Sequence, residues 1–236
     1  MSSVHYISLL YGLTFLIISF ILIREMKKIT SSPLKNIFWS FTAFIVTKTT
    51  FIISDLSLNF LVLDNIFLPN NIPPFIVIIN TLSVVFSIIS NVFLFHFGIS
   101  ILTYKTSLKI DYKIFPMFLF IIYMSLFLSG IIEFYSAERI SRYSFGFNGA
   151  FLGSLGCFNL YTINRKHHGE KKMLLWYITC GIALFFYAGT EGIIIKPILG
   201  ISVDILRLLS SITLLISAFF IVELPKEEHR DRIGFI

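Results

Sequence analysis

Apolar stretches long enough to cross a membrane dominate the pattern of this chain. A helix spans the hydrocarbon core of a bilayer with about 20 apolar residues. Stretches of that kind run approximately over 5–23, 38–58, 75–104, 114–133, 145–163, 173–195 and 201–223. Pro73, Pro116 and Pro225 mark several of their ends, where a proline interrupts a helix most easily. The pattern predicts an all-α integral membrane protein built as a bundle of seven transmembrane helices.

The composition supports a membrane protein and excludes an ordinary soluble domain. Of 236 residues, 56% are hydrophobic and only 14% are charged, and the mean hydropathy is +0.86. A soluble domain of this size needs far more polar surface. The first stretch lacks a basic start and a small-residue cleavage site, so we expect a retained first span rather than a signal peptide. We expect one transmembrane domain over 1–224 and a short cytoplasmic tail over 225–236.

The lysines and arginines predict the orientation of the bundle. Fourteen of the nineteen follow the first, third, fifth and seventh apolar stretches. The connections on the other side hold only Arg139, Arg142 and Lys196. Cytoplasmic loops of membrane proteins carry the excess of lysine and arginine. The N-terminus is therefore expected outside and the C-terminus in the cytoplasm. Because the basic residues lie in short runs between apolar stretches, they do not indicate a nucleic-acid partner.

With this orientation, the polar residues inside the spans concentrate toward the outer side. Charged side chains in lipid are costly and are expected to face the bundle interior. We therefore predict an outward-facing polar pocket for a small molecule, closed on the cytoplasmic side by apolar residues. The alternative is that these residues only fix helix ends at the interface, and this explanation is favoured for Asp55 and Glu133. The outer and midplane residues are Asp55, Glu133, Glu191, Asn80, Asn148, Asp204, Arg207, Lys48 and Asn91.

Six of these residues are the candidate ligand contacts: Arg207, Asp204, Lys48, Glu191, Asp55 and Asn80. Lys48 is expected near the midplane, too deep for its stem to reach water, and with a carboxylate partner such as Asp204, Glu191 or Asp55. Asp204 and Arg207 are three residues apart and share a helix face. They can form a structural ion pair, or they can receive a zwitterionic or anionic ligand through the Arg207 guanidinium. The sequence leaves both explanations open.

Small residues recur in the fifth apolar stretch, "FGFNGAFLGSLGCF". Glycines 146, 149, 153 and 156 lie three or four residues apart, a spacing that lets another helix approach closely. The partner helix can belong to the same chain or to a second copy in a homodimer.

Trp39 and Trp176 occupy positions typical of interfacial aromatic residues.

Signals for catalysis and for cofactors are weak, so we expect no catalytic residues, no metal and no cofactor. HExxH, GxSxG and P-loop motifs do not occur in the sequence. Cys157 and Cys180 are far apart in sequence without a CxxC motif, which disfavours a disulfide framework or a zinc site. His96 has no evident partner for binding haem, and the last span lacks the lysine expected of a retinal protein. An intramembrane enzyme acting on lipid stays open as an alternative.

Several stretches resemble the seven-helix membrane sensor module found at the N-terminus of bacterial histidine kinases and GGDEF-type diguanylate cyclases. These are "LYGLTFLIISFILI", "SPLKNIFWSFTAF", "RYSFGFNGAFLGSLG" and "GISVDILRLLSSITLLISAFFIVEL". In the last stretch, the Leu206–Arg207 step carries the resemblance. The chain departs from the family where Lys48 and Ile52 stand in place of an expected histidine and acidic residue, and where Ser202 stands in place of a common proline.

The resemblance implies a multi-pass sensor in a bacterial cell membrane, which detects a small molecule from outside and acts on a separate cytoplasmic signalling partner. A small-solute transporter is the alternative. Transporters often have inverted repeats and interrupted helices, and the odd number of continuous spans favours the sensor.

Overall fold

The structure is a computed structural model that describes residues 3–27, 32–63, 74–104, 134–166, 171–191 and 202–222. In this part of the chain every regular element is helical. The elements are α1 (Ser3–Met26), α2 (Ser32–Leu63), α3 (Pro74–Thr103), α5 (Phe134–Ser141), η1 (Arg142–Phe147), α6 (Asn148–Lys166), α7 (Lys171–Glu191) and α9 (Val203–Val222). The predicted all-α class is confirmed for these residues.

Five of the described helices are long and apolar enough to cross a membrane. The candidate spans lie in α1, α2, α3, α7 and α9, and they run over Ser8–Met26, Lys35–Leu58, Pro74–Thr103, Lys171–Thr190 and Val203–Phe220. They correspond to five of the stretches predicted from the sequence. The chain is therefore a multi-pass membrane protein by helix length and composition. The predicted span 114–133 lies outside the described residues.

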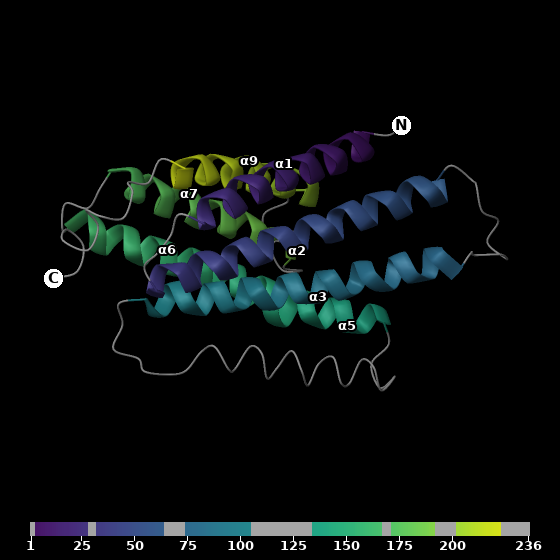
Figure 1. The fold of residues 1–236 in the computed structure, drawn as a ribbon, viewed down its shortest axis with the longest axis horizontal. Coiled ribbons are helices and arrows are strands. Elements are labelled where there is room, and N and C mark those ends of the chain that lie inside the picture. Colours follow the sequence, from purple (N-terminus) through teal and green to yellow (C-terminus); the bar gives the residue numbers. More distant parts are fainter. Residues whose placement is uncertain are drawn as a thin grey trace.

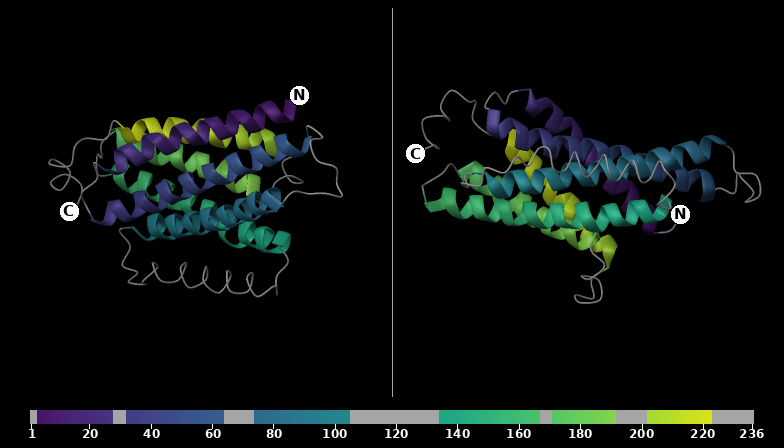
Figure 2. Two further views of the ribbon diagram at one scale, coloured as in Figure 1. Left: turned by 45° about the vertical axis from the view of Figure 1, so that its right-hand side comes forward. Right: turned by 90° about the horizontal axis from the view of Figure 1, so that it is seen from below.

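The predicted span 145–163 belongs to a longer helix that the sequence did not indicate. Residues 134–166 are helical throughout, because α5, the π-helical segment η1 and α6 follow one another without a break. Figure 2 shows this long helix lying beside α3. The helix starts at Phe134 rather than near 145, so Arg139 and Arg142 lie on a helix and not in a connection. The first turns of the helix contain polar residues, so the apolar stretch in the sequence begins several residues after the helix does.

The helices enclose a common interior. Contacts between neighbouring helices close a ring in the order α1, α2, α3, α6, α7 and α9, and α1 completes the ring by contacting α9. Helices α2 and α7 run in one direction, and the other four run in the opposite direction (Figure 1). Inside the ring, side chains of α2 and α7 meet, as in the contact between Phe38 and Trp176 with ring centroids 5.0 Å apart.

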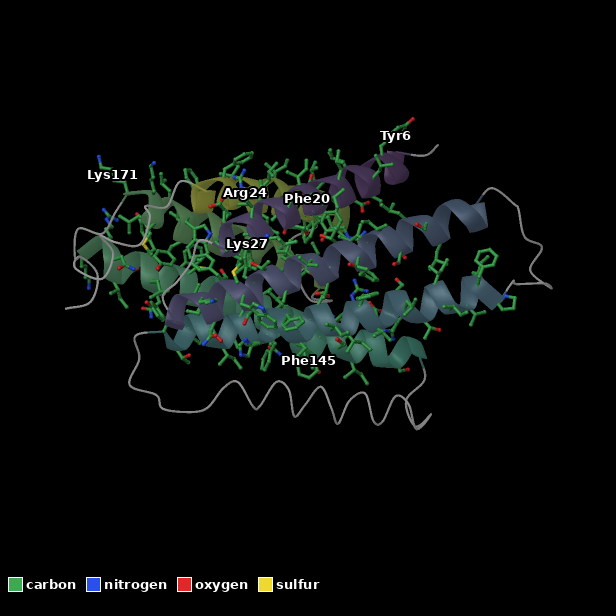
Figure 3. The ribbon with its side chains drawn as sticks, viewed as in Figure 1. Tyr6, Phe20, Arg24, Lys27, Phe145 and Lys171 are labelled. Carbon is green, nitrogen blue, oxygen red and sulfur yellow. The ribbon has the colours of Figure 1, made fainter. Side chains whose placement is uncertain are left out.

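One end of the bundle carries most of the described basic residues, and we call it the basic end. Here α1, α3, α6 and α9 finish and α2 and α7 begin. Its lysines and arginines are Arg24, Lys27, Lys35, Arg165, Lys166, Lys171 and Lys172. Three of them are labelled in Figure 3, whereas Tyr6 lies toward the other end, which we call the opposite end.

The hydrophobic core lies mainly in the half of the bundle nearer the basic end. On α3 its members are Leu94, Phe97 and Ile101, which come late in a helix that runs toward the basic end. Its largest side chains on the other helices include Phe15, Phe38, Phe41, Phe44, Trp176, Tyr177 and Leu184. Trp39 is 52% exposed, as expected for an interfacial residue, but Trp176 is only 2% exposed. The Trp176 ring packs on Phe38 and Tyr177 inside the ring of helices.

Candidate functional site

Buried polar residues occur along the whole length of the described bundle. Nearer the basic end they are mostly serine and threonine, with Glu25 as the charged exception, and Glu25 accepts a hydrogen bond from Arg24 Nε at 2.8 Å. Toward the opposite end, α3 turns four polar side chains inward: Ser83, Ser87, Ser90 and Asn91. The buried ammonium of Lys48 lies in the middle of α2.

Lys48 occupies the interior between α2 and α7, as its position in the sequence predicted. It is 4% exposed. Its ammonium lies 4.8 Å from the ring centroid of Phe51 and 5.4 Å from that of Tyr187. A cation over an aromatic face is attracted by the ring quadrupole, and the attraction is strongest where water is excluded. Two aromatic rings on two helices therefore position this charge, a contact that the sequence did not predict.

A second polar group, the α3–α5 polar seam, joins α3 to the start of the long helix. Ser87 Oγ donates a hydrogen bond to Glu138 Oε1 at 3.2 Å. One turn along α3, Asn91 Nδ2 donates to Ser141 Oγ at 3.1 Å. Arg142 Nε lies 3.6 Å from the same Glu138 oxygen. Glu138 and Ser141 were not predicted as site residues, because they precede the apolar residues of the fifth stretch. Their i, i+3 spacing on a helix is the signal that could have found them.

The π-helical segment makes the space that holds Asn91. Asn91 contacts Ser141 and Gly146, which are five residues apart, and a Cβ atom on Gly146 would lie 2.9 Å from Asn91 Oδ1. Further along, Gly98 lies against Gly149 and Gly153, which are four residues apart as in a regular α-helix. The extra residue of the π turn and the missing side chain at Gly146 together accommodate the amide. Its Oδ1 is buried without a protein hydrogen-bond partner. Such π segments occur frequently at functional sites.

Arg207 and Asp204 form an ion pair at the start of α9. Arg207 Nη1 lies 3.8 Å from Asp204 Oδ1, and each side chain is 39% exposed. This distance is close to the limit for an ion pair, and an exposed pair of this kind contributes about 0–1 kcal/mol. Since arginine has five N–H donors, the pair leaves most of the hydrogen-bonding capacity of Arg207 available to another group. The structure thus places the two residues together but leaves open whether they are structural or receive a ligand.

The described candidate residues lie on α2, α3 and α9. Asp55 is exposed on α2, and Asn80 is half-buried near the start of α3. Glu191 is the last residue of α7, and its side chain lies outside what the structure describes, as does Glu133. Lys48, Asp204 and Arg207 are described, but no direct contact between Lys48 and the ion pair is seen.

The glycines of the long helix pack against α3 of the same chain. A Cβ atom on Gly149 would lie 2.5 Å from the backbone nitrogen of Phe95, and one on Gly156 would lie 2.7 Å from that of Leu102. The close partner is thus internal, which the sequence could not decide.

Cys157 and Cys180 are both buried and free.

Comparison with protein-family models, with curated proteins and with solved structures gave no match. The resemblance to the bacterial sensor module therefore rests on the quoted stretches of sequence alone.

Proposed function

We propose that this chain is a sensor module of a bacterial cell membrane that binds a small zwitterion or anion from outside and performs no catalysis. In this proposal the chain crosses the membrane seven times, with the N-terminus outside and the C-terminus in the cytoplasm. The observation that carries the proposal is the unequal interior of the bundle. The basic end holds the apolar core, whereas Lys48, the α3–α5 polar seam and the Arg207–Asp204 pair lie from the middle toward the opposite end.

The direction of the helices supports the proposed number of spans. Contacts such as Asn91 with Gly146 and Ile101 with Gly156 advance together along α3 and the long helix, so the two run parallel. Helix α3 therefore ends at the basic end, and the long helix starts at the opposite end. The stretch predicted as a span over 114–133 is long and apolar enough to cross the membrane between these two ends.

The basic end supports the proposed orientation. It carries Arg24 and Lys27 at the end of α1, Lys35 on α2, Arg165 on α6 and Lys171 on α7. Lysine and arginine gather on the cytoplasmic side of membrane proteins. The polar interior then opens toward the outside, where a ligand arrives, and α9 links it to the cytoplasmic side, where a separate signalling partner would be contacted.

Charge chemistry supports a zwitterion or an anion as the ligand. Guanidinium groups bind carboxylates and phosphates through paired N–H donors. Arg207 offers such a group beside an acid, Asp204, which can in turn receive an ammonium. We assign Lys48 as a further cationic contact and Glu191, Asp55 and Asn80 as polar contacts of the same ligand pocket.

Thermal-shift screening of the purified protein tests this function. Amino acids and small carboxylates are screened against the intact chain, the Arg207→Ala variant and the Arg165→Ala variant, which removes an exposed arginine at the basic end. A ligand at 100 times its Kd stabilises the folded state by about 2.7 kcal/mol. We expect a compound that raises Tm for the intact chain and for Arg165→Ala but not for Arg207→Ala. The proposal fails if no compound raises Tm, or if Arg207→Ala keeps the full shift.

A small-solute transporter is the second candidate, and the π-helical segment favours it. Substrate sites of transporters are often formed where a transmembrane helix is interrupted, and η1 interrupts the regular α-helical geometry of the long helix beside Asn91. Uptake of a stabilising compound into proteoliposomes distinguishes the two. Accumulation inside the vesicles supports transport, whereas binding without uptake supports sensing.

A further inference from the structure

Two buried polar atoms, one on α7 and one on α9, have no protein hydrogen-bond partner. They are the indole Nε1 of Trp176 and the Oγ of Ser217. Trp176 is 2% exposed and Ser217 is fully buried. Leaving a buried donor or acceptor unsatisfied costs about 1–3 kcal/mol. Each of these atoms therefore requires an explanation.

The register of the two helices places these residues opposite each other. Ser210 Oγ donates to the carbonyl of Ala183 at 3.2 Å, which fixes one point of contact between antiparallel helices. Trp176 lies seven residues before Ala183, and Ser217 lies seven residues after Ser210. Seven residues are about two helical turns and return to the same face. By this register, Trp176 and Ser217 occupy corresponding positions on α7 and α9, two turns closer to the basic end than the contact between Ser210 and Ala183.

The hydroxyl of Ser217 does not use the partner that its neighbours use. On the same helix, Thr213 Oγ1 donates to the carbonyl of Leu209 at 2.7 Å, and Ser211 Oγ donates to that of Leu208 at 2.9 Å. Serine and threonine in helices commonly make this bond to a carbonyl one turn back. Ser217 makes no such bond, although the carbonyl of Thr213 stands at the corresponding position. Its hydroxyl is available to a group lying between α7 and α9.

The hydrogen-bonding groups of the two side chains can both bond to one water molecule. An indole N–H can only donate, so its partner must accept, while a serine hydroxyl can donate or accept. Buried water typically makes about three hydrogen bonds to buried polar groups that lack other partners. Water can accept from Trp176 Nε1 and bond to Ser217 Oγ, and the second lone pair of the Thr213 carbonyl provides a third partner. We propose that Trp176 and Ser217 hold an internal water molecule between α7 and α9.

At this water site, the distance between α7 and α9 can change without breaking a direct hydrogen bond between them. At Ser210 the helices are joined directly, but at Ser217 they are joined through water, which can move as the distance between them changes. The inference does not depend on the proposed ligand or on the sensing function, because it concerns side chains remote from Arg207 and Lys48.

The two tryptophans of the chain make the site accessible to nuclear magnetic resonance. Trp39 is 52% exposed, so the Trp39→Phe variant keeps the core and leaves Trp176 as the single indole. This protein, labelled with ¹⁵N-tryptophan in lipid nanodiscs, gives one indole N–H signal. A rotating-frame Overhauser spectrum then separates direct contact with water from chemical exchange by the sign of the peak.

We expect a direct water contact at the Trp176 indole proton. Ser217→Ala in the same background should weaken or remove it, whereas Ser210→Ala, which alters the direct bond two turns away, should preserve it. Tm of each variant confirms that it is folded. An indole proton without a water contact would overturn the inference, as would a contact with the Ser217 hydroxyl in place of water. A water contact of unchanged intensity in Ser217→Ala would also overturn it.

Discussion

Among single residues, Lys48 shows how this bundle places a charge in its interior. Its depth and burial could be predicted from its place in an apolar stretch, because a lysine near the midplane cannot reach water. Its aromatic surroundings could not be predicted. Phe51 is three residues away on α2, but Tyr187 comes from α7, and only the folded ring of helices brings it to Lys48. Contacts across the bundle depend on helix rotation, which the apolar pattern does not specify.

A double-mutant cycle measures the contact between Lys48 and Tyr187. The variants are Lys48→Met, Tyr187→Leu and the combination, and the free energy of unfolding is measured in mixed micelles. A buried cation–π contact contributes about 2 kcal/mol, and the cycle isolates this pairwise energy from the other partners of each residue. We expect a coupling of about 1–2 kcal/mol. Additive effects of the two substitutions would show that the ring does not stabilise the ammonium.

At the scale of the elements, the contact between α3 and the long helix depends on glycine. A Cβ atom on Gly149 would meet backbone atoms of Phe95, which cannot move without displacing α3. One on Gly12 would meet only the side-chain tips of Leu56 and Ile52, at 3.0 and 3.1 Å. The glycine spacing predicted close packing correctly, and only the structure identified α3 as the partner.

Alanine substitutions at these two glycines test that contact. Overpacking a tight interior costs about 1–3 kcal/mol, and we expect Gly149→Ala to lower the free energy of unfolding by this amount. Gly12→Ala is the matched control, and we expect a change below about 1 kcal/mol because flexible side chains can give way and alanine favours a helix. Equal effects in denaturant unfolding would contradict the close approach of α3 to Gly149.

The π segment was not predictable from the sequence. Its residues, "RYSFGF", carry no propensity that distinguishes a π turn from an α turn. What distinguishes it is Asn91 of α3, whose amide lies between Ser141 and Gly146. The π turn is therefore explained by a residue of another helix, Asn91 of α3.

Deleting one residue from the π segment tests this explanation. Deletion of Ser144, which is exposed, should convert the segment to regular α-helix and remove the space for the Asn91 amide. We expect a loss of about 1–3 kcal/mol in the free energy of unfolding, as for other overpacked interiors. Combining the deletion with Asn91→Ser, which shortens the side chain, should recover part of the loss. A combined variant no more stable than the deletion alone would show that Asn91 is not the cause.

At the scale of the whole molecule, the hydrophobic core lies mainly nearer the basic end, whereas Lys48, Asn91 and the Arg207–Asp204 pair lie from the middle toward the opposite end. The sequence predicted an unequal distribution of polar residues, because the positive-inside pattern predicted an orientation and, with it, a depth for each polar residue. The sequence could not show which polar residues meet. Asp204 and Arg207 share one helix, so their proximity follows from their spacing, whereas Ser87 with Glu138 and Asn91 with Ser141 join different helices.

The proposed function requires a ligand pocket that is reached from outside at the end of the bundle opposite the basic end, and cysteine labelling tests this requirement most directly. Arg207→Cys is labelled in intact cells with a charged, membrane-impermeant thiol reagent. Phe219→Cys, at a position 56% exposed on the apolar part of α9, serves as the lipid-facing control. The native Cys157 and Cys180 are fully buried and give the background. We predict rapid labelling of Arg207→Cys from outside and none of the control or the intact chain. Absence of labelling at position 207, or equal labelling at 219, would contradict it.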